Sequence, residues 1–292
     1  MTVHVARLLL GGALALATAP ISTHAQGAPP ASPRADSLRM ASRLDTDGQH
    51  IAARVIFQRL IDGAPDPAAK AAAQRRMALS HAFEGQCREA VRYEELVIAY
   101  WKTREAAEPQ NAFYQQGEMA NEAARVCIDA GDIDTAERMY RRGTELGLRE
   151  PTPRTHPVSL WEFRLAHARA RIAARRGRAA EAKQQVEVAK SLLDADTAMA
   201  SQQARFYPYL VGYVALYTND LATAEAELSR ALAMPGNTND PFLHALLAMT
   251  YEKKGDAAAA APLVQKAYDL STGHNPPAAF ARPWARKKLG TR

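Results

Sequence analysis

The sequence predicts an all-α protein of about six helix hairpins that stack into an α-solenoid. Three observations support this: alanine dominates a hydrophobic share of 47%, clusters of β-branched residues are scarce, and a pattern of small residues occurs six times. Alanine favours helices that pack closely, whereas strands prefer β-branched and aromatic side chains. With 292 residues, the chain is long enough for one large domain or two ordinary ones.

Each repeat has a turn residue followed five positions later by alanine. The six pairs are Gly48/Ala53, Gly85/Ala90, Gly131/Ala136, Gly177/Ala182, Asn219/Ala224 and Gly255/Ala260. Twelve residues before each alanine stands another small residue, in order Ala41, Ala78, Ala124, Ala170, Gly212 and Ala248. Gly or Asn permits the left-handed conformation of a turn, and small residues let two helices approach closely. We therefore expect each repeat to form a helix hairpin whose uncovered apolar side packs on its neighbour.

Large residues continue the buried side of each second helix. Four residues after each alanine come Phe57, Glu94, Tyr140, Val186, Leu228 and Val264, followed three residues later by Leu60, Val97, Gly143, Ala189, Ala231 and Ala267. Only Glu94 breaks the apolar rule at the first of these positions. Glu94 and Glu95 point about 100° apart on a helix, so they do not face a common reacting atom. We expect this pair to be solvated or to bridge helices through ion pairs.

One stretch resembles the tetratricopeptide repeat family. It runs from Leu210-Val211-Gly212-Tyr213 through Asp220-Leu221-Ala222-Thr223-Ala224, and continues with Leu228, Ala231 and Pro235. The resemblance covers residues 35–272 and implies a right-handed α-solenoid that binds a partner on its concave face. Successive alanines are spaced 37, 46, 46, 42 and 36 residues apart. Three of these intervals exceed the family's repeat of about 34 residues by eight to twelve residues, so we expect longer helices or extended connections there.

The first 25 residues have the features of a secretory signal peptide. Arg7 gives a basic start, residues 8–19 are apolar, and Thr23-His24-Ala25 offers a cleavage site after Ala25. The apolar stretch is shorter than the roughly 20 residues that a membrane-spanning helix needs. We therefore expect a periplasmic or secreted protein without a transmembrane segment after cleavage, and any association with the cell envelope would run through a partner.

Proline and glycine mark the other boundaries. Residues 26–34 form a Gly/Pro/Ser-rich leader, in which Ser32-Pro33 suits a helix start. The solenoid is expected over 35–272, with breaks at 63–67, 149–157, 235–241 and 273–277. Residues 273–292 should form a C-terminal capping helix and tail, whose basic residues suit an element that faces water. These basic residues are Arg282, Arg286, Lys287 and Lys288.

Cys87 and Cys127 are the two cysteines of the chain. An even count in an exported protein favours a disulfide. Cys87 follows the Gly85 turn and Cys127 precedes the Gly131 turn, which places them at the same end of adjacent hairpins. The alternative is that both are small buried residues without a bond. A zinc site is not expected, because close companion ligands are missing.

The sequence contains none of the common catalytic or cofactor motifs. Its eight histidines are scattered, and there is no His-Glu-x-x-His site, Gly-rich phosphate loop or nucleophile elbow. We expect no metal, no cofactor and no enzymatic activity. The net charge of +6 is modest, and export argues against a nucleic-acid partner.

The first helices carry the candidate binding residues, which recur at fixed offsets from the small residues. The fourth repeat gives a basic stripe of Arg164, His167, Arg171 and Arg175, and the fifth an aromatic stripe of Phe206, Tyr209, Tyr213 and Tyr217. The sixth contributes Phe242, Ala245 and Met249, and the second contributes Arg75, Leu79 and Phe83. Arginine and tyrosine together suit a carboxylate or a peptide backbone. An exposed row of aromatic rings favours binding of a protein or peptide partner.

Several alternatives remain open from the sequence. The arginines could form an ordinary solvated face on which the tyrosines pack as cation–π partners. The tyrosines could stack on sugars of a cell-wall ligand, or the chain could be a structural spacer that oligomerises. An enzyme carried by Arg164, His167 and the tyrosines is the least favoured reading, because no general base with a partner is visible.

Overall fold

The computed structural model describes residues 33–290, so the expected signal peptide (1–25) and residues 26–32 of the leader lie outside the described residues. Within this range every regular element is a helix and none is a strand. No helix among these residues is long and apolar enough to cross a membrane. The elements are α1 (Pro33–Thr46), α2 (His50–Asp62), α3 (Pro67–Ala82), α4 (Cys87–Lys102), α5 (Pro109–Ala130), α6 (Ile133–Gly147), α7 (Val158–Arg175), α8 (Ala179–Ala195), α9 (Thr197–Gln203), η1 (Ala204–Phe206), α10 (Tyr207–Tyr217), α11 (Leu221–Ala233), α12 (Pro241–Lys254), α13 (Ala257–Leu270) and α14 (Pro276–Leu289).

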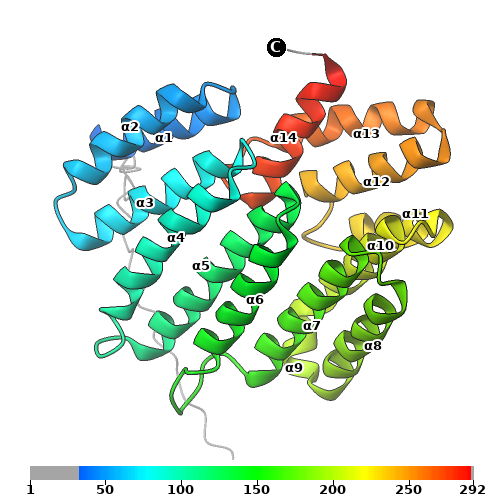
Figure 1. Ribbon diagram of the computed structural model, residues 1–292, viewed down its shortest axis with the longest axis horizontal. Helices are drawn as coiled ribbons and strands as arrows, with labels where there is room; N and C mark the ends of the chain where they lie inside the picture. The colour runs from blue at the N-terminus through cyan, green and yellow to red at the C-terminus, as the bar shows by residue number, and fades with distance from the viewer. Residues whose placement is uncertain (1–32, 291–292) are drawn as a thin grey trace, which may run out of the picture. The chain divides into compact units, whose positions relative to one another are not determined.

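Consecutive helices pack against one another along the chain (Figure 1). All six expected turn residues adopt positive φ, namely Gly48, Gly85, Gly131, Gly177, Asn219 and Gly255. The six alanines that follow them are at most 3% exposed, and so are the small residues Ala41, Ala78, Ala124, Ala170 and Ala248. The repeated pattern therefore marks the tight turns and the close helix contacts between them.

Gly212 shows why the first helix of a pair needs a small residue. A Cβ at this position would lie 2.7 Å from Leu228 Cγ and 3.1 Å from the Leu228 backbone nitrogen. Both distances are shorter than normal van der Waals contact, and one of the two atoms belongs to the backbone of α11. The helices α10 and α11 can therefore approach this closely only because residue 212 has no side chain.

We predict that Gly212→Ala destabilises the protein by about 1–3 kcal/mol. In an uncrowded helix the same change would stabilise by roughly 0.5–1 kcal/mol, so the sign of the effect is diagnostic. Urea unfolding followed by circular dichroism measures it, with Ala222→Ser at an exposed position of α11 as a control. A neutral or stabilising Gly212→Ala would contradict the close contact.

The expected breaks agree with the ends of α2, α6, α11 and α13. The three longest repeat intervals have different sources. The first contains the 22-residue helix α5, and the second contains the connection between α6 and α7. The third contains the short helix α9 with the 3-10 turn η1, which the sequence did not indicate and which lies between α8 and α10.

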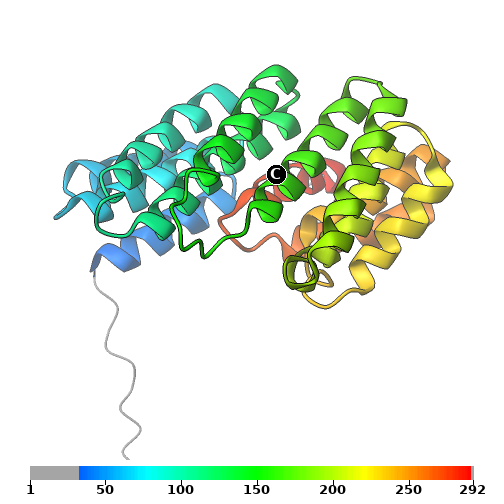
Figure 2. The ribbon, with the colours of Figure 1, turned by 90° about the horizontal axis from the view of Figure 1, so that it is seen from below.

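The C-terminal helix α14 does more than cover the last pair of helices. It packs against α12 and α13, and also against α1, α3 and α5 from the start of the chain (Figures 1 and 2). The expectation that Arg282 and Arg286 face water is wrong, because Arg282 Nε and Arg286 Nη2 donate hydrogen bonds to the Thr46 carbonyl at 2.8 and 2.6 Å. Those bonds satisfy a carbonyl at the C-terminal end of α1, where no intrahelical donor remains.

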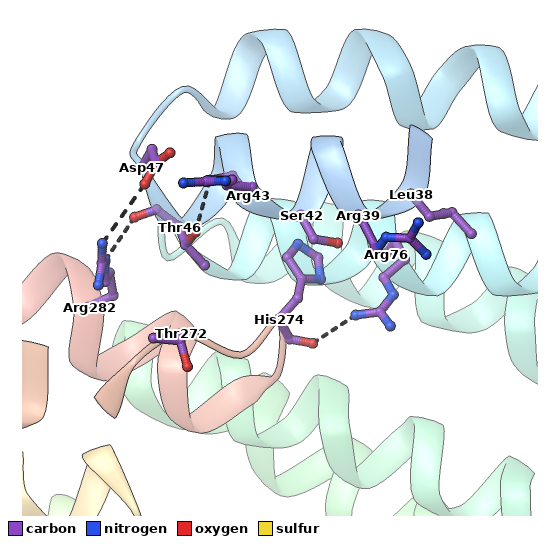
Figure 3. A pocket seen from close by; sticks show the side chains of 10 residues that line it. All are labelled: Leu38, Arg39, Ser42, Arg43, Thr46, Asp47, Arg76, Thr272, His274 and Arg282. Atoms are coloured by element: carbon purple, nitrogen blue, oxygen red, sulfur yellow. Dashed lines mark hydrogen bonds and ion pairs between the residues drawn. The ribbon is translucent and has the colours of Figure 1, made fainter. Parts of the chain in front are cut away.

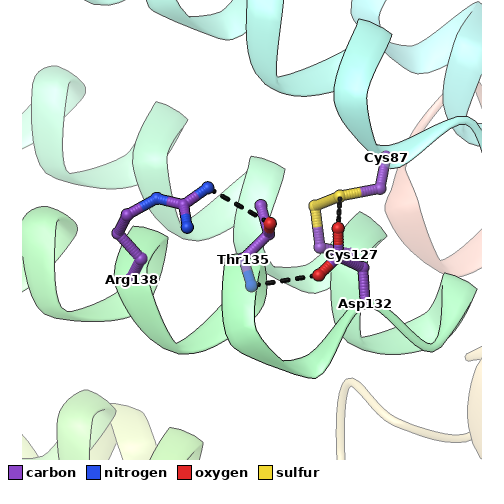
Figure 4. Close-up of a disulfide and its surroundings, with 5 residues drawn as sticks. All are labelled: Cys87, Cys127, Asp132, Thr135 and Arg138. Carbon is purple, nitrogen blue, oxygen red and sulfur yellow. Dashed lines mark hydrogen bonds between the residues drawn. A yellow bond between two sulfur atoms is a disulfide. The ribbon is translucent and has the colours of Figure 1, made fainter.

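A disulfide joins Cys87 at the start of α4 to Cys127 near the end of α5 (Figure 4). Both residues are buried, and the bond closes a sequence separation of 40 residues. Their neighbour Asp132 caps α6 by accepting a hydrogen bond from the Thr135 backbone nitrogen. The disulfide therefore fixes the end of α5, from which the next turn and helix continue.

Breaking this disulfide should lower the free energy of unfolding by about 4 kcal/mol, the chain-entropy value for a loop of this length. Thermal unfolding with and without reductant measures the loss. The double variant Cys87→Ala/Cys127→Ala should have the same melting temperature as the reduced protein. Intact-mass analysis after alkylation checks the bond itself. Two free thiols in the folded, unreduced protein would contradict it.

Candidate functional site

The first helices bring residues at the same offsets onto one shared surface, which we call the first-helix face. These residues lie six and three positions before, and one and five positions after, the small residue of each pair. The members used below are Glu118, Asn121, Arg125 and Asp129 on α5; Arg164, His167, Arg171 and Arg175 on α7; Phe206, Tyr209, Tyr213 and Tyr217 on η1 and α10; and Phe242 and Met249 on α12.

A cavity of about 330 Å³ opens on this face between α5, α7 and α10. Five of the residues expected from the sequence line it: Arg164, His167, Arg171, Phe206 and Tyr209. Arg75, Arg175, Tyr213, Tyr217, Phe242 and Met249 were also expected in the site but do not line this cavity. Pro276 at the start of α14 completes part of the wall.

The expected row of exposed aromatic rings is wrong for Tyr213 and Phe242, which are 0% and 1% exposed. Tyr209, with 8% exposure, is also largely covered. The Phe242 ring packs on Phe280 of α14 with ring centroids 4.9 Å apart, and Arg175 donates a hydrogen bond to the Tyr213 hydroxyl at 3.3 Å. These two aromatic side chains therefore contribute to packing, because α14 and the neighbouring arginines cover them.

Arg171 is the central charge of the cavity and is 6% exposed. Its Nη2 donates to the Tyr140 hydroxyl at 2.7 Å, and its Nη1 donates to the Tyr209 hydroxyl at 3.1 Å. Its Nε is buried and has no hydrogen-bond partner. The two phenols fix the plane of the guanidinium but do not neutralise its charge.

Arg125 on α5 brings a second guanidinium to the same cavity. Its Cζ lies 4.8 Å from the centre of the Phe242 ring, and its Nε is buried without a hydrogen-bond partner. Among the described residues, no ion pair links Arg125 or Arg171 to a carboxylate. The two guanidiniums therefore contact aromatic side chains, and the Asp129 carboxyl acts on them without forming an ion pair.

Acidic residues of α5 form ion pairs with two other predicted arginines. Glu118 forms an ion pair with Arg164, and Glu122 forms one with Arg75 at 2.6 Å. The contribution of α5 was not predicted, although the same offsets applied to Ala124 give Glu118, Asn121, Arg125 and Asp129. The repeat offsets therefore could have identified these residues. They do not stand out in the sequence, because their charges are mixed, whereas the α7 residues are all basic or histidine and the residues of η1 and α10 are all aromatic.

His167 is held in its neutral form. Burial lowers its pKa well below the usual value, and the positive charge of Arg171 lowers it further. Its Nε2 is buried and has no hydrogen-bond partner. The imidazole therefore contributes an unused polar atom, and no added charge, to the cavity.

Glu94 is a buried carboxyl group, whereas the sequence predicted that it is solvated or forms an inter-helix ion pair. It is 1% exposed and occupies the position that large apolar residues hold in the other repeats. Burial raises its pKa well above the usual value, and the neighbouring charge of Glu122 adds to the effect. Glu95, in contrast, forms an inter-helix ion pair with Arg142 at 2.7 Å, so the expectation is wrong for Glu94 and correct for Glu95.

Asp129 continues the line of charges on α5 and titrates at an unusual pH. Burial raises its pKa to about 6, against the opposing effect of Arg125, Arg171 and Arg175. The folded protein therefore holds the Asp129 proton more tightly than the unfolded chain does. The stability that this proton contributes is full below about pH 4 and is lost as the pH rises through about 6.

We predict that Asp129→Asn flattens the pH dependence of stability between pH 4 and pH 7. The shift from 3.8 to about 6 corresponds to at most about 3 kcal/mol. Urea unfolding of both proteins across this range gives the difference, because the other titrating groups are common to both. Parallel stability curves for the two proteins would show that Asp129 titrates normally.

Among residues 33–290, no group of three or more His, Cys, Asp or Glu side chains is arranged to hold a metal ion. In sequence, the chain matches no protein-family model and no curated protein.

Proposed function

We propose that this chain is an exported, non-enzymatic peptide-binding scaffold, a tetratricopeptide-like α-solenoid whose first-helix cavity binds the carboxylate end of a partner protein. The observation that carries the proposal is the pair Arg125 and Arg171, two guanidiniums that line one cavity and, among the described residues, form no ion pair with a carboxylate. The Asp129 carboxyl acts on both guanidiniums but forms no ion pair with either, so their charges are only partly compensated, which is costly for buried groups. An anionic ligand would remove that cost and gain charge-assisted hydrogen bonds.

The repeated geometry supports the solenoid part of the proposal. Six turns with positive φ each separate two packed helices, and the small residues of each pair are buried. Such pairs leave an apolar side that the next pair covers, so the array grows in one direction. The first helices then share one face, which is the surface that repeat proteins of this kind use for binding.

The cavity has the size and lining for a terminal residue. Its volume of about 330 Å³ lies at the small end of the roughly 300–1,000 Å³ range of ligand pockets. A carboxylate in the cavity would pair with the guanidiniums of Arg125 and Arg171, whose Nε atoms have no hydrogen-bond partner. Phe163, Phe206 and Tyr209 supply apolar and aromatic walls for the last side chain of the peptide.

The disulfide is consistent with export. Disulfides persist in the periplasm and outside the cell and are rare in reducing compartments. The bond between Cys87 and Cys127 therefore agrees with the signal-like sequence of residues 1–25.

A peptide library with free C-terminal carboxylates, compared with the same library carrying C-terminal amides, tests the proposal. We expect the free carboxylates to bind about tenfold more tightly or better, and Arg125→Gln to abolish that preference. The variant Arg169→Gln removes an exposed arginine of α7 and should bind as the unchanged protein does. Circular dichroism of each variant confirms that the helices are intact.

Equal binding of both libraries, or unchanged binding by Arg125→Gln, would contradict the proposal. Binding of peptidoglycan fragments with no preference for peptide ends would favour the cell-wall alternative. A protein that binds none of these probes but associates with itself in light scattering would favour the spacer.

A further inference from the structure

A second cavity, separate from the first-helix cavity, lies between α1 and the C-terminal segment (Figure 3). Its volume is about 540 Å³. Residues of α1 line one side, Arg76 of α3 lies at the edge, and Thr272, His274 and Arg282 come from the opposite end of the chain. The cavity exists only because α14 packs back against the first helices.

The lining of this cavity is strongly basic. It contains Arg39, Arg43, Arg76 and Arg282 against one acidic residue, Asp47. Arg39 pairs outside the cavity with Asp36, and Arg282 lies 3.9 Å from Asp47. Two of the four arginines that line the cavity therefore have no acidic partner.

Arg43 and Arg76 carry these unneutralised charges. Among the described residues, neither forms an ion pair with a carboxylate, and Arg76 Nη1 donates to the His274 carbonyl at 3.1 Å. Burial and the neighbouring charge of Arg75 lower the pKa of Arg76 below its usual value. Arg76 nevertheless keeps its charge at neutral pH, because the pKa of a guanidinium lies far above 7.

His274 adds a buried polar atom without a partner. Its side chain is 2% exposed, and its Nε2 lies 2.8 Å from Asp45 Oδ2. The Asp45 carboxylate only accepts hydrogen bonds, and it also accepts one from the Ser80 hydroxyl at 2.8 Å. Nε2 of His274 must therefore be the donor, which leaves Nδ1 of the neutral ring as an acceptor with no hydrogen-bond partner.

We propose that this cavity binds a phosphate group between the two ends of the helical array. Phosphate oxygens would accept from Arg43 and Arg76, and the Ser42 hydroxyl on the same wall offers a further donor. A phosphate monoanion carries an O–H that can donate to His274 Nδ1, which a carboxylate cannot do. The volume exceeds that of phosphate alone, so the group is expected as a monoester of a small molecule or of a lipid, because a diester has no O–H to donate.

This site is independent of the proposed peptide function, because the two cavities share no lining residue. Its ligand would contact both α1 and the C-terminal segment, so binding would strengthen the contact between them. Thermal unfolding is therefore a direct readout, since a ligand that binds only the folded state raises the melting temperature.

The test titrates the purified protein with inorganic phosphate, glycerol phosphate and sodium chloride at matched ionic strength. We expect the two phosphate probes to raise the melting temperature by about 3 °C at a tenfold excess over their Kd, and chloride to have no such effect. Vesicles that contain phosphatidic acid, a lipid phosphomonoester, compared with vesicles of phosphatidylcholine alone, distinguish a lipid head group from a free ester. Binding to vesicles without binding to glycerol phosphate would assign the lipid source.

Arg43→Gln is the first variant, because Arg43 is exposed and its loss should leave the fold intact. We expect it to weaken binding of glycerol phosphate about tenfold, and Arg43→Gln/Arg76→Gln to abolish binding. Arg88→Gln, an exposed arginine of α4, is the matched control. Equal stabilisation by chloride and phosphate, or unchanged phosphate binding by Arg43→Gln in a folded protein, would overturn the proposal.

Discussion

The close approach of paired helices at a small residue is the constraint on which the rest of the structure depends. In the fifth pair there is no room for even a Cβ on Gly212 beside Leu228. In the third and fourth pairs, Ala124 and Ala170 are fully buried in the same position. Because this contact fixes the rotation of each first helix, the residues around it fall on one shared face. The first-helix cavity is therefore a consequence of the same residues that make the helices pair.

The sequence was sufficient for the local structure, because each turn and each close contact depends on residues near one another in the chain. The six positive-φ residues and the buried alanines were all identified in this way. The path of α14 was not identifiable, because its partners at the start of the chain lie far away in sequence, as in the bond from Arg286 to Thr46 across 240 residues. No local pattern distinguishes a helix that caps one end from a helix that joins both.

The candidate site could be predicted in part for the same reason. Offsets from the small residues placed Arg164, His167 and Arg171 around one cavity, but exposure depends on what covers a side chain. Phe242 is covered by Phe280 of α14, so a pattern on α12 alone could not show that it is buried. Ion pairs between helices could not be predicted either, because their partners are far apart in sequence. Glu118 and Arg164, for example, are 46 residues apart.

The return of α14 to the first helices has a consequence for how this chain can vary. Most helical repeat arrays can gain or lose a unit, because each unit contacts only its neighbours. Here Arg282 and Arg286 must reach Thr46, and an inserted or deleted pair of helices would move them out of range. The number of repeats is therefore set by closure between the two ends, as the number of strands is in a closed barrel.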